Sequence, residues 1–277
     1  MPELAFEEND FKKFSRYVYD VAGINLHDGK KELLKARLAK ILREREFSSF
    51  REYYSRVIND TSGYELTLLL NALSTNLTYF FREPQHFDFL EKEVFPEMAR
   101  SRQSSKDKQL RLWSAGCSSG EEAYTMAMTA FEALGPSAEH QIEILATDLS
   151  TKVLAMARTG IYKQEKTNKI PPKLGRRYFQ KGRNRWKGYF RVKKEIREKV
   201  KFERLNLIEE FQFDKPFDVI FCRNVMIYFD TPTRQMLVEK LYRTLAPGGY
   251  LFIGHSESLT GLRHNFKYIQ PAIFKKV

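Results

Sequence analysis

The stretch WSAGCSSGEEAYTMAM, from Trp113 to Met128, decides how this sequence folds. An apolar strand leads into a glycine-containing loop, Ala115 to Gly120, and a helix follows. Such loops commonly hold phosphate at a helix N-terminus, yet here the first helical residues are Glu121 and Glu122. The loop also matches neither GxGxxG nor GxxxxGK[ST]. It is therefore either a tight turn with an acidic first helical turn, which the helix dipole favours, or a site for a ligand that is not an anion.

Short apolar strands alternate with helices after residue 109. The strands are LRLWSA, IEILATD, FDVIFCR and YLFIG, and helical stretches at 121–134 and 151–158 separate the first three. This alternation favours a parallel sheet with helices on both faces, which is an α/β fold. The last segment, FKYIQPAIFKKV, is expected to close a terminal hairpin.

The first 99 residues show a different pattern, because their apolar residues recur at helical spacing. A polar segment without any apolar residue, SRQSSKDKQ, then separates them from the first strand. We therefore expect a helical N-terminal domain at 1–99, a linker at 100–109 and an α/β domain at 110–277.

Positive charge is concentrated in one part of the chain. The net charge is +12, and residues 161–204 alone hold 17 Lys or Arg and four Glu. This basic segment interrupts the alternation of strands and helices, and its glycines and aromatic residues suggest a small β excursion from the sheet. A concentrated basic patch requires an anionic partner, which is nucleic acid, acidic lipid or an acidic protein surface.

Composition also restricts the compartment. No apolar run approaches the length of a membrane span, and the N-terminus MPELAFEEND lacks the basic and apolar regions of a signal peptide. Two cysteines, Cys117 and Cys222, provide no disulfide framework. We therefore expect a cytoplasmic protein without direct membrane insertion.

Ligands of open α/β sheets bind beyond the carboxyl ends of the strands, and four features should meet there. The loop 115–120 is the first. Asp148, at the end of the second strand, is the next, because a carboxylate there can accept both hydroxyls of a ribose. Its alternative is a cap, with Ser150, for the helix that begins at Thr151.

The other two features supply polar residues from distant parts of the chain. These are Arg223, Asn224 and Tyr228 in CRNVMIYF, and Asn76, Thr78 and Arg82 in STNLTYFFRE. Each has a structural alternative, namely solvation of the surface, packing in the core, or an aromatic cluster at a helix end beside a solvated arginine.

An adenosine ligand with a cationic end accounts for the whole set. S-adenosylmethionine offers a ribose to Asp148, a sulfonium and an ammonium to the acidic loop, and a carboxylate to an arginine. Glu122, or else Glu121, would bind the ammonium or a ribose hydroxyl. We expect this cofactor, with S-adenosylhomocysteine as product. We expect no metal, because the five histidines show no ligand spacing.

These motifs together resemble the chemotaxis-receptor glutamate O-methyltransferases of bacteria. The resemblance covers most of the chain and is strongest in STNLTYFFRE, WSAGCSSGEEAY, ATDLS, FCRNVMIYF and LAPGGYLFIGHSE, in that order. It implies an all-α N-terminal domain followed by a Rossmann-like class I S-adenosylmethionine-dependent methyltransferase domain. A small inserted β-subdomain is implied where the basic segment 161–204 lies.

The resemblance also implies roles for single residues. It places on the cofactor Asn76, Thr78, Arg82, Glu122, Asp148, Asn206, Leu207, Arg223 and Asn224. Tyr228 is implied to lie beside the transferred methyl group, with Arg223 also catalytic. Members of the family carry a further substrate-orienting arginine on the helix after FFRE, where only Arg100 is available.

The implied reaction methylates glutamate side chains of chemoreceptors and so forms methyl esters in sensory adaptation. A glutamate with a pKa of about 4.3 is ionised at neutral pH, so no general base is needed, which agrees with the absence of an obvious catalytic His–acid pair. Removing water and aligning oxygen, methyl and sulfur supplies most of the catalysis. Arg223 or Arg82 can fix a carboxylate by paired hydrogen bonds.

The implied partner is the cytoplasmic helical region of a chemoreceptor. A basic helical face fits its acidic surface and comprises Lys30, Lys31, Arg37, Lys40 and Arg43. The alternative is an ordinary solvated face. The segment 161–204 can hold a receptor tether peptide at a β edge. We expect charge attraction to dominate binding, and a monomeric enzyme.

Rival functions fit the sequence less well. A nucleic-acid methyltransferase would use the basic segment 161–204, with nearby aromatic residues for stacking, but CRNVMIYF stands where such amino-methylating enzymes carry an Asn-Pro-Pro-Tyr-like motif. A non-catalytic adaptor would not need the intact Asp148, Arg223 and Tyr228. A hydrolase would need glycine as the last residue of GHSES. We therefore expect no nucleic-acid partner.

Overall fold

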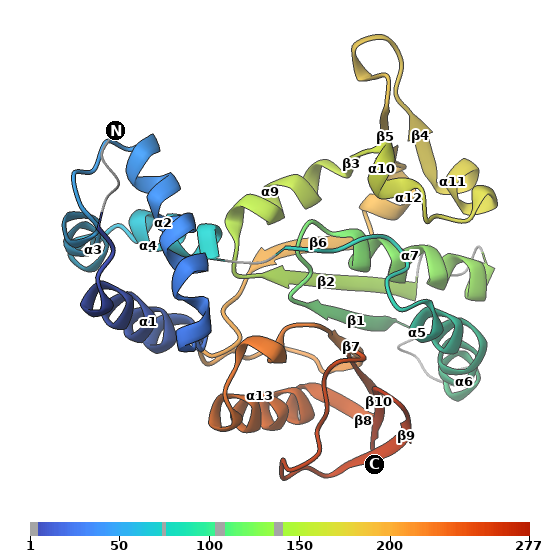
Figure 1. Ribbon diagram of the computed structural model, residues 1–277. Helices are drawn as coiled ribbons and strands as arrows, with labels where there is room; N and C mark the ends of the chain where they lie inside the picture. The colour runs from blue at the N-terminus through green and yellow to red at the C-terminus, as the bar shows by residue number, and fades with distance from the viewer. Residues whose placement is uncertain (1–4, 74–75, 103–108, 136–140) are drawn as a thin grey trace.

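A seven-stranded sheet forms the centre of the molecule (Figure 1). The computed structural model describes residues 5–73, 76–102, 109–135 and 141–277. The strand order is β6-β2-β1-β7-β8-β10-β9; β10 runs antiparallel to both of its neighbours, β8 and β9, and the other neighbouring strands of this sheet pair in parallel. The strands are β1 (Leu110–Ala115), β2 (Ile142–Asp148), β6 (Val200–Arg204), β7 (Phe217–Cys222), β8 (Leu245–Ile253), β9 (Phe266–Gln270) and β10 (Ile273–Lys276). This topology confirms the predicted α/β fold and its terminal hairpin.

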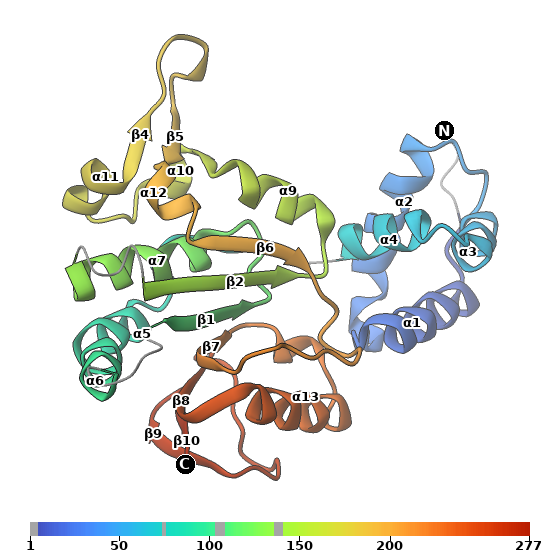
Figure 2. The ribbon, with the colours of Figure 1, turned by 180° about the vertical axis from the view of Figure 1, so that it is seen from behind.

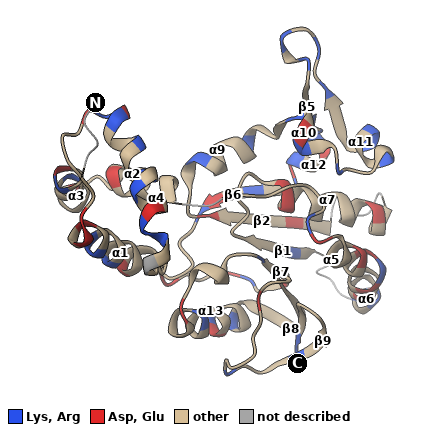
Figure 3. Cartoon of the chain, viewed as in Figure 1, with Lys and Arg blue, Asp and Glu red and all other residues tan. Residues whose placement is uncertain are grey.

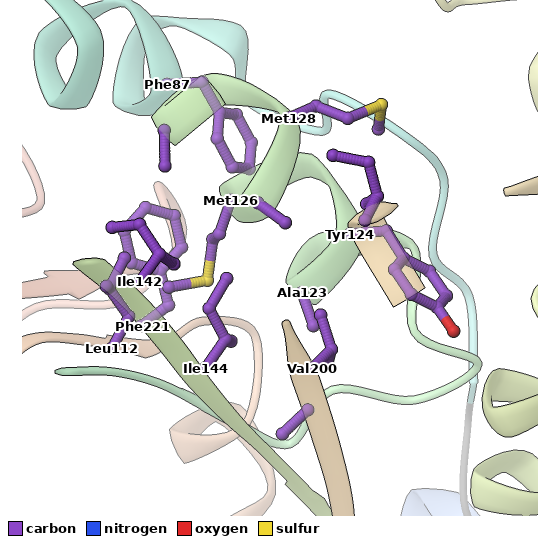
Figure 4. Packing of buried hydrophobic residues seen from close by; sticks show 14 of the residues in the cluster. Phe87, Leu112, Ala123, Tyr124, Met126, Met128, Ile142, Ile144, Val200 and Phe221 are labelled. Atoms are coloured by element: carbon purple, nitrogen blue, oxygen red, sulfur yellow. The ribbon is translucent and has the colours of Figure 1, made fainter. Parts of the chain in front are cut away.

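Alternating side chains on the central strands build two cores, one on each face of the sheet. On β7, Val219 and Phe221 belong to one core, and Ile220 and Cys222 belong to the other. The first core is covered by α7 (Glu121–Leu134), whose Met126 packs over the sheet as Figure 4 shows. The second core is covered by α13 (Thr231–Thr244). Burial on both faces explains why these strands are continuous apolar runs.

The N-terminal helices have a core of their own beyond the carboxyl ends of the parallel strands (Figures 1 and 2). They are α1 (Glu8–Ala22), α2 (Lys31–Glu44), α3 (Phe50–Asn59) and α4 (Tyr64–Leu73), with the short turn η1 (Asp28–Lys30) ahead of α2. No helix among the described residues combines the length and the apolar composition needed to cross a membrane.

A second group of helices, at 84–101, packs on the sheet instead of on the N-terminal core. It runs without a break through α5 (Pro84–Phe89), the π turn η2 (Leu90–Val94) and α6 (Phe95–Ser101). Packing therefore divides the chain before Phe80, whereas the sequence places the boundary at residue 99. The apolar stripe predicts a helix but does not reveal which core it joins. Residues 103–108 of the expected linker lie outside the described residues.

The basic segment forms a small sheet that projects from the molecule (Figure 2). Its order is β3-β5-β4, all antiparallel, with strands β3 (Ile161–Lys163), β4 (Phe179–Lys181) and β5 (Tyr189–Val192). Between and after these strands lie α10 (Gln164–Thr167), α11 (Pro172–Tyr178), η4 (Asn184–Trp186) and α12 (Lys194–Arg197), and α9 (Thr151–Thr159) leads into the segment. The end of the expected insert differs, because residues 200–204 form β6 and pair with β2 in the main sheet.

Candidate functional site

A pocket of about 320 Å³ lies where the end of α1 meets the carboxyl ends of β1, β2 and β7. Residues from both helical and α/β parts line it. All the predicted catalytic and cofactor residues except Arg100 take part, namely Asn76, Thr78, Arg82, Glu122, Asp148, Asn206, Leu207, Arg223, Asn224 and Tyr228. Arg100 is exposed on α6 and does not line the pocket. Its predicted substrate-orienting role at this site therefore finds no support in its position.

The loop after β1 is shaped by close approach of other chain segments. Gly116 has a φ of +85°, and a Cβ atom there would lie 2.4 Å from Cγ2 of Val225. Its backbone N–H and that of Cys117 both donate to the carbonyl of Thr147, each at 2.8 Å. Glycine is therefore required at position 116 for both its conformation and its size, and the loop is fixed between β2 and the segment after β7.

Asp148 lines the pocket and accepts two backbone hydrogen bonds. Its Oδ2 accepts from the N–H of Ser118 and its Oδ1 accepts from the N–H of Ser150, both at 2.8 Å. Burial raises the pKa of Asp148, although these bonds oppose the shift. The cap of α9 is Ser150, whose hydroxyl accepts from the N–H of Val153. Asp148 thus holds the backbone of Ser150 but is not itself the N-cap. Each of its carboxylate oxygens retains a further acceptor site.

The two glutamates that begin α7 have different surroundings. Glu121 is fully buried, and its carboxylate lies 2.5 Å from Nζ of Lys166 and accepts from the hydroxyl of Ser119 at 2.6 Å. Glu122 lines the pocket and accepts from the hydroxyl of Ser114 at 2.7 Å. Of the two, Glu122 is therefore the residue positioned to contact a ligand, whereas Glu121 is bound within the protein by Lys166 and Ser119.

Arg223 is the centre of a buried ion cluster. Its side chain is 1% exposed, and its two terminal nitrogens lie 3.1 Å from Oε2 of Glu122 and 3.0 Å from Oε2 of Glu83. It also donates to the carbonyl of Arg82. Burial raises the pKa of Glu122 against the attraction of Arg223. For Glu83 burial also acts to raise the pKa, but Arg223, with His255 and His86, outweighs it and lowers the pKa.

Either Arg223 or Arg82 was predicted to bind a carboxylate, and this cluster distinguishes between them. The guanidinium of Arg223 is occupied by two carboxylates and a carbonyl, so its position favours orienting Glu122 over binding a third carboxylate. Arg82 also lines the pocket and is only partly buried, and its Nη1 donates to the carbonyl of Leu77 at 2.7 Å.

The segment that carries Tyr228 is held by a carboxylate without a predicted role. Tyr228 ends the short turn η5 (Met226–Tyr228), and its carbonyl accepts from the N–H of Asn25, just after α1 in the N-terminal domain, 2.8 Å away. Glu257 accepts from the N–H groups of Gly254, Asn224 and Val225 at 2.6, 2.8 and 2.9 Å. Asn224 has a φ of +59°, and these bonds hold it in that conformation.

Glu257 and Glu83 are the residues that the sequence analysis missed. Both stand in motifs that carry the family resemblance, GHSE and FFRE, so the motifs themselves held the signal. Their partners are backbone amides and a guanidinium 140 positions away. Pattern and spacing along the chain do not reveal such contacts.

Replacing Glu257 by alanine is expected to lower the free energy of unfolding by about 2 kcal/mol, since three backbone N–H groups lose their acceptor. The loosened segment 224–228 should also reduce kcat more than cofactor affinity, because Tyr228, which is expected to lie beside the transferred methyl group, ends that segment. Urea unfolding and initial-rate assays would measure both effects. Ser256→Ala, an exposed change beside Glu257 in the turn after β8, is the control. Unaltered stability in Glu257→Ala would contradict the role assigned here.

Asn206 and Leu207 line the pocket from the segment that follows β6. The side-chain amide of Asn206 donates to the carbonyl of Val21 at 2.7 Å and to Oε1 of Glu209 at 2.9 Å. It thereby ties this segment to α1. Leu207 is 7% exposed and presents an apolar surface to the pocket. The pocket lining therefore combines apolar side chains with two carboxylates, as a nucleoside with a cationic end requires.

Comparison with known proteins places the chain in a family. The model described as "CheR methyltransferase, SAM binding domain" matches residues 76–274, and "CheR methyltransferase, all-alpha domain" matches residues 9–74. These matches divide the chain where the two cores divide it. The expected methyltransferase fold and cofactor are confirmed, and the nucleic-acid methyltransferase alternative receives no support.

Similar proteins extend over nearly the whole sequence. The "Chemotaxis protein methyltransferase" of Borreliella burgdorferi is 41% identical over 271 residues, which cover 97% of this chain and 94% of that protein. "Chemotaxis protein methyltransferase 2" of Pseudomonas aeruginosa is 39% identical, with coverage of 98% and 94%. The Escherichia coli protein named "Chemotaxis protein methyltransferase" is 38% identical, with coverage of 95% and 89%. The chain belongs to the CheR methyltransferase family and is an S-adenosylmethionine-dependent methyltransferase.

Proposed function

We propose that the protein transfers the methyl group of S-adenosylmethionine to glutamate carboxylates of a chemoreceptor and so forms methyl esters. The observation that carries this specificity is the chemistry of the pocket wall. The described residues that line the pocket include no histidine and no lysine, and both of its carboxylates are engaged by Arg223 or by backbone amides. An amine or hydroxyl acceptor would need a base there, whereas an ionised glutamate needs none.

The pocket can hold the cofactor through complementary charge. Asp148 would accept the ribose hydroxyls, and Glu122, oriented by Arg223, would bind the ammonium group or a ribose hydroxyl. Leu207 would pack against the adenine. Arg82 would bind a carboxylate, and Tyr228 would lie beside the methyl group. Bringing an anion to a sulfonium in a site that excludes water lets the two charges cancel as the reaction proceeds.

The basic face of α2 would bind the receptor through charge attraction. Figure 3 shows Lys and Arg along this helix. Lys31 pairs with Glu8 at 2.7 Å and Lys40 with Glu44 at 3.8 Å. Exposed pairs of this kind contribute little to stability, so they can exchange for receptor carboxylates. Arg37 differs, because it donates to the last carbonyls of α4, including that of Ala72 at 2.9 Å. We assign the contact chiefly to Lys30, Lys31, Lys40 and Arg43, and a receptor tether peptide to the edge of the basic sheet.

Product chemistry tests this function. The protein would be incubated with radiolabelled S-adenosylmethionine and either a receptor cytoplasmic fragment, RNA or DNA. Label should enter only the receptor, should be released by mild alkali as methanol, and should map to glutamates by mass spectrometry. A receptor fragment whose mapped glutamates are changed to alanine is the matched control and should accept no label. Alkali-stable label, or label in nucleic acid, would overturn the proposal.

A further inference from the structure

Three metal-ligating side chains converge beside the cofactor pocket. Oε2 of Glu83 lies 3.5 Å from Nδ1 of His86 and 4.0 Å from Nε2 of His255. One ligand atom from each residue can be chosen so that all three lie within 4.8 Å of one another. His255 comes from the turn after β8, so the histidine spacing along the chain, which predicts no metal, does not reveal this cluster.

His86 is the observation that points to a ligand. It is 1% exposed, and neither of its ring nitrogens has a hydrogen-bond partner among the described residues. Its ring is packed against Phe252 and His255, with centroid separations of 5.6 and 4.7 Å. Buried polar atoms are rarely left without a partner. A ligand between the two rings and the carboxylate would give one of these nitrogens, Nδ1, a partner.

We propose that Glu83, His86 and His255 form a binding site for a divalent transition-metal ion of the zinc class. Two imidazole nitrogens and a carboxylate oxygen are a ligand set that zinc accepts, with water in the fourth position. Zinc–nitrogen and zinc–oxygen bonds of about 2.0–2.1 Å place tetrahedral ligand atoms roughly 3.4 Å apart. The separation between Oε2 of Glu83 and Nδ1 of His86, 3.5 Å, is close to this value. His255 is 45% exposed, so its ring can turn to complete the site and the ion can enter from solvent.

The site is coupled to the cofactor pocket through one oxygen atom. Oε2 of Glu83 lies 3.0 Å from Arg223, and the same guanidinium holds Glu122 at 3.1 Å. A dication bound to that oxygen removes the anionic partner of Arg223 and repels the guanidinium. Zinc therefore lowers the affinity for the cofactor. This coupling rests on the proposed contact of Glu122 with the cofactor, whereas the metal site itself does not.

Titration calorimetry of the untagged full-length protein with zinc chloride tests the site without any cofactor. The unchanged chain should bind one zinc ion. So should His264→Gln, a change of an exposed histidine outside the cluster. His255→Gln should bind it at least about tenfold more weakly while melting at the same temperature. Cobalt(II) should give the visible spectrum of a tetrahedrally coordinated ion with the unchanged chain and with His264→Gln, but not with His255→Gln. Equal zinc affinity in all three proteins, or no binding by any, overturns the site.

A second titration, with S-adenosylhomocysteine in the presence and absence of zinc, tests the coupling. Zinc should weaken this ligand severalfold for the unchanged chain and for His264→Gln, and much less for His255→Gln. Zinc binding that leaves the affinity for S-adenosylhomocysteine unaltered overturns the coupling. Failure to bind S-adenosylhomocysteine without zinc would instead contradict the proposed cofactor contacts, so the two failures are distinguishable.

Discussion

Replacing Asp148 by alanine should weaken the binding of S-adenosylhomocysteine about 100-fold. A buried carboxylate that accepts two ribose hydroxyls makes charge-assisted hydrogen bonds, and loss of the pair costs about 3 kcal/mol. Calorimetry would give the dissociation constant directly. Glu143→Ala, an exposed change near the other end of β2, should bind normally. Affinity within about twofold of the unchanged chain in Asp148→Ala would refute the ribose contact.

The same carboxylate should make binding depend on pH. Because burial raises the pKa of Asp148, the carboxylate gains a proton above the usual range of an aspartate, and affinity for the ligand should fall as pH is lowered through that raised pKa. Burial raises the pKa of Glu122 as well, so it adds to the effect. The folding stability of the unliganded protein should change with pH in the opposite direction. A raised carboxyl pKa in the folded state contributes stability at low pH that is lost as pH rises through it. Asp148→Asn should reduce both dependences, which calorimetry and thermal melts across pH would measure.

Most of the fold could be predicted because it depends on local patterns. The central strands are apolar runs bounded by turns, and α7 was expected at the residues where it occurs. Polar residues directly after parallel strands must gather at one edge of the sheet. This rule explains why Asp148, Arg223 and Asn224 line one pocket, as predicted.

The rest depends on contacts between distant parts of the chain. The helical period at 84–101 predicts a helix without showing that it packs on the sheet. Arg37 occupies a basic helical face, yet it donates to carbonyls of α4, and nothing in the period of α2 distinguishes it from its solvated neighbours. Glu83 and His86 follow each other closely, but their meeting with His255 requires the carboxyl end of β8 to arrive beside α5. Tertiary packing, not propensity, decides these positions.

Substituting Arg223 by methionine should lower the free energy of unfolding by about 3–5 kcal/mol at neutral pH. The change leaves two carboxylates, Glu83 and Glu122, without their cation in a site where each is 14% exposed, and removal of one member of a buried ion cluster has a cost of this size. Binding of S-adenosylhomocysteine should fall together with stability, because Glu122 loses its orientation. Urea unfolding at several pH values would measure the first effect and calorimetry the second.

The pH dependence and a compensating variant separate this explanation from simple loss of packing. In the unchanged chain, Arg223 outweighs burial and lowers the pKa of Glu83, so that carboxylate contributes stability above its unfolded pKa that is lost as pH falls. Without the arginine, both carboxylates are stabilised by protonation instead. The stability deficit of Arg223→Met should therefore shrink toward acid pH. Combining it with Glu83→Gln and Glu122→Gln removes the uncompensated charges, and should restore most of the stability but not the affinity. A deficit that is constant with pH and persists in the triple variant would show that side-chain volume, rather than charge, is what Arg223 supplies.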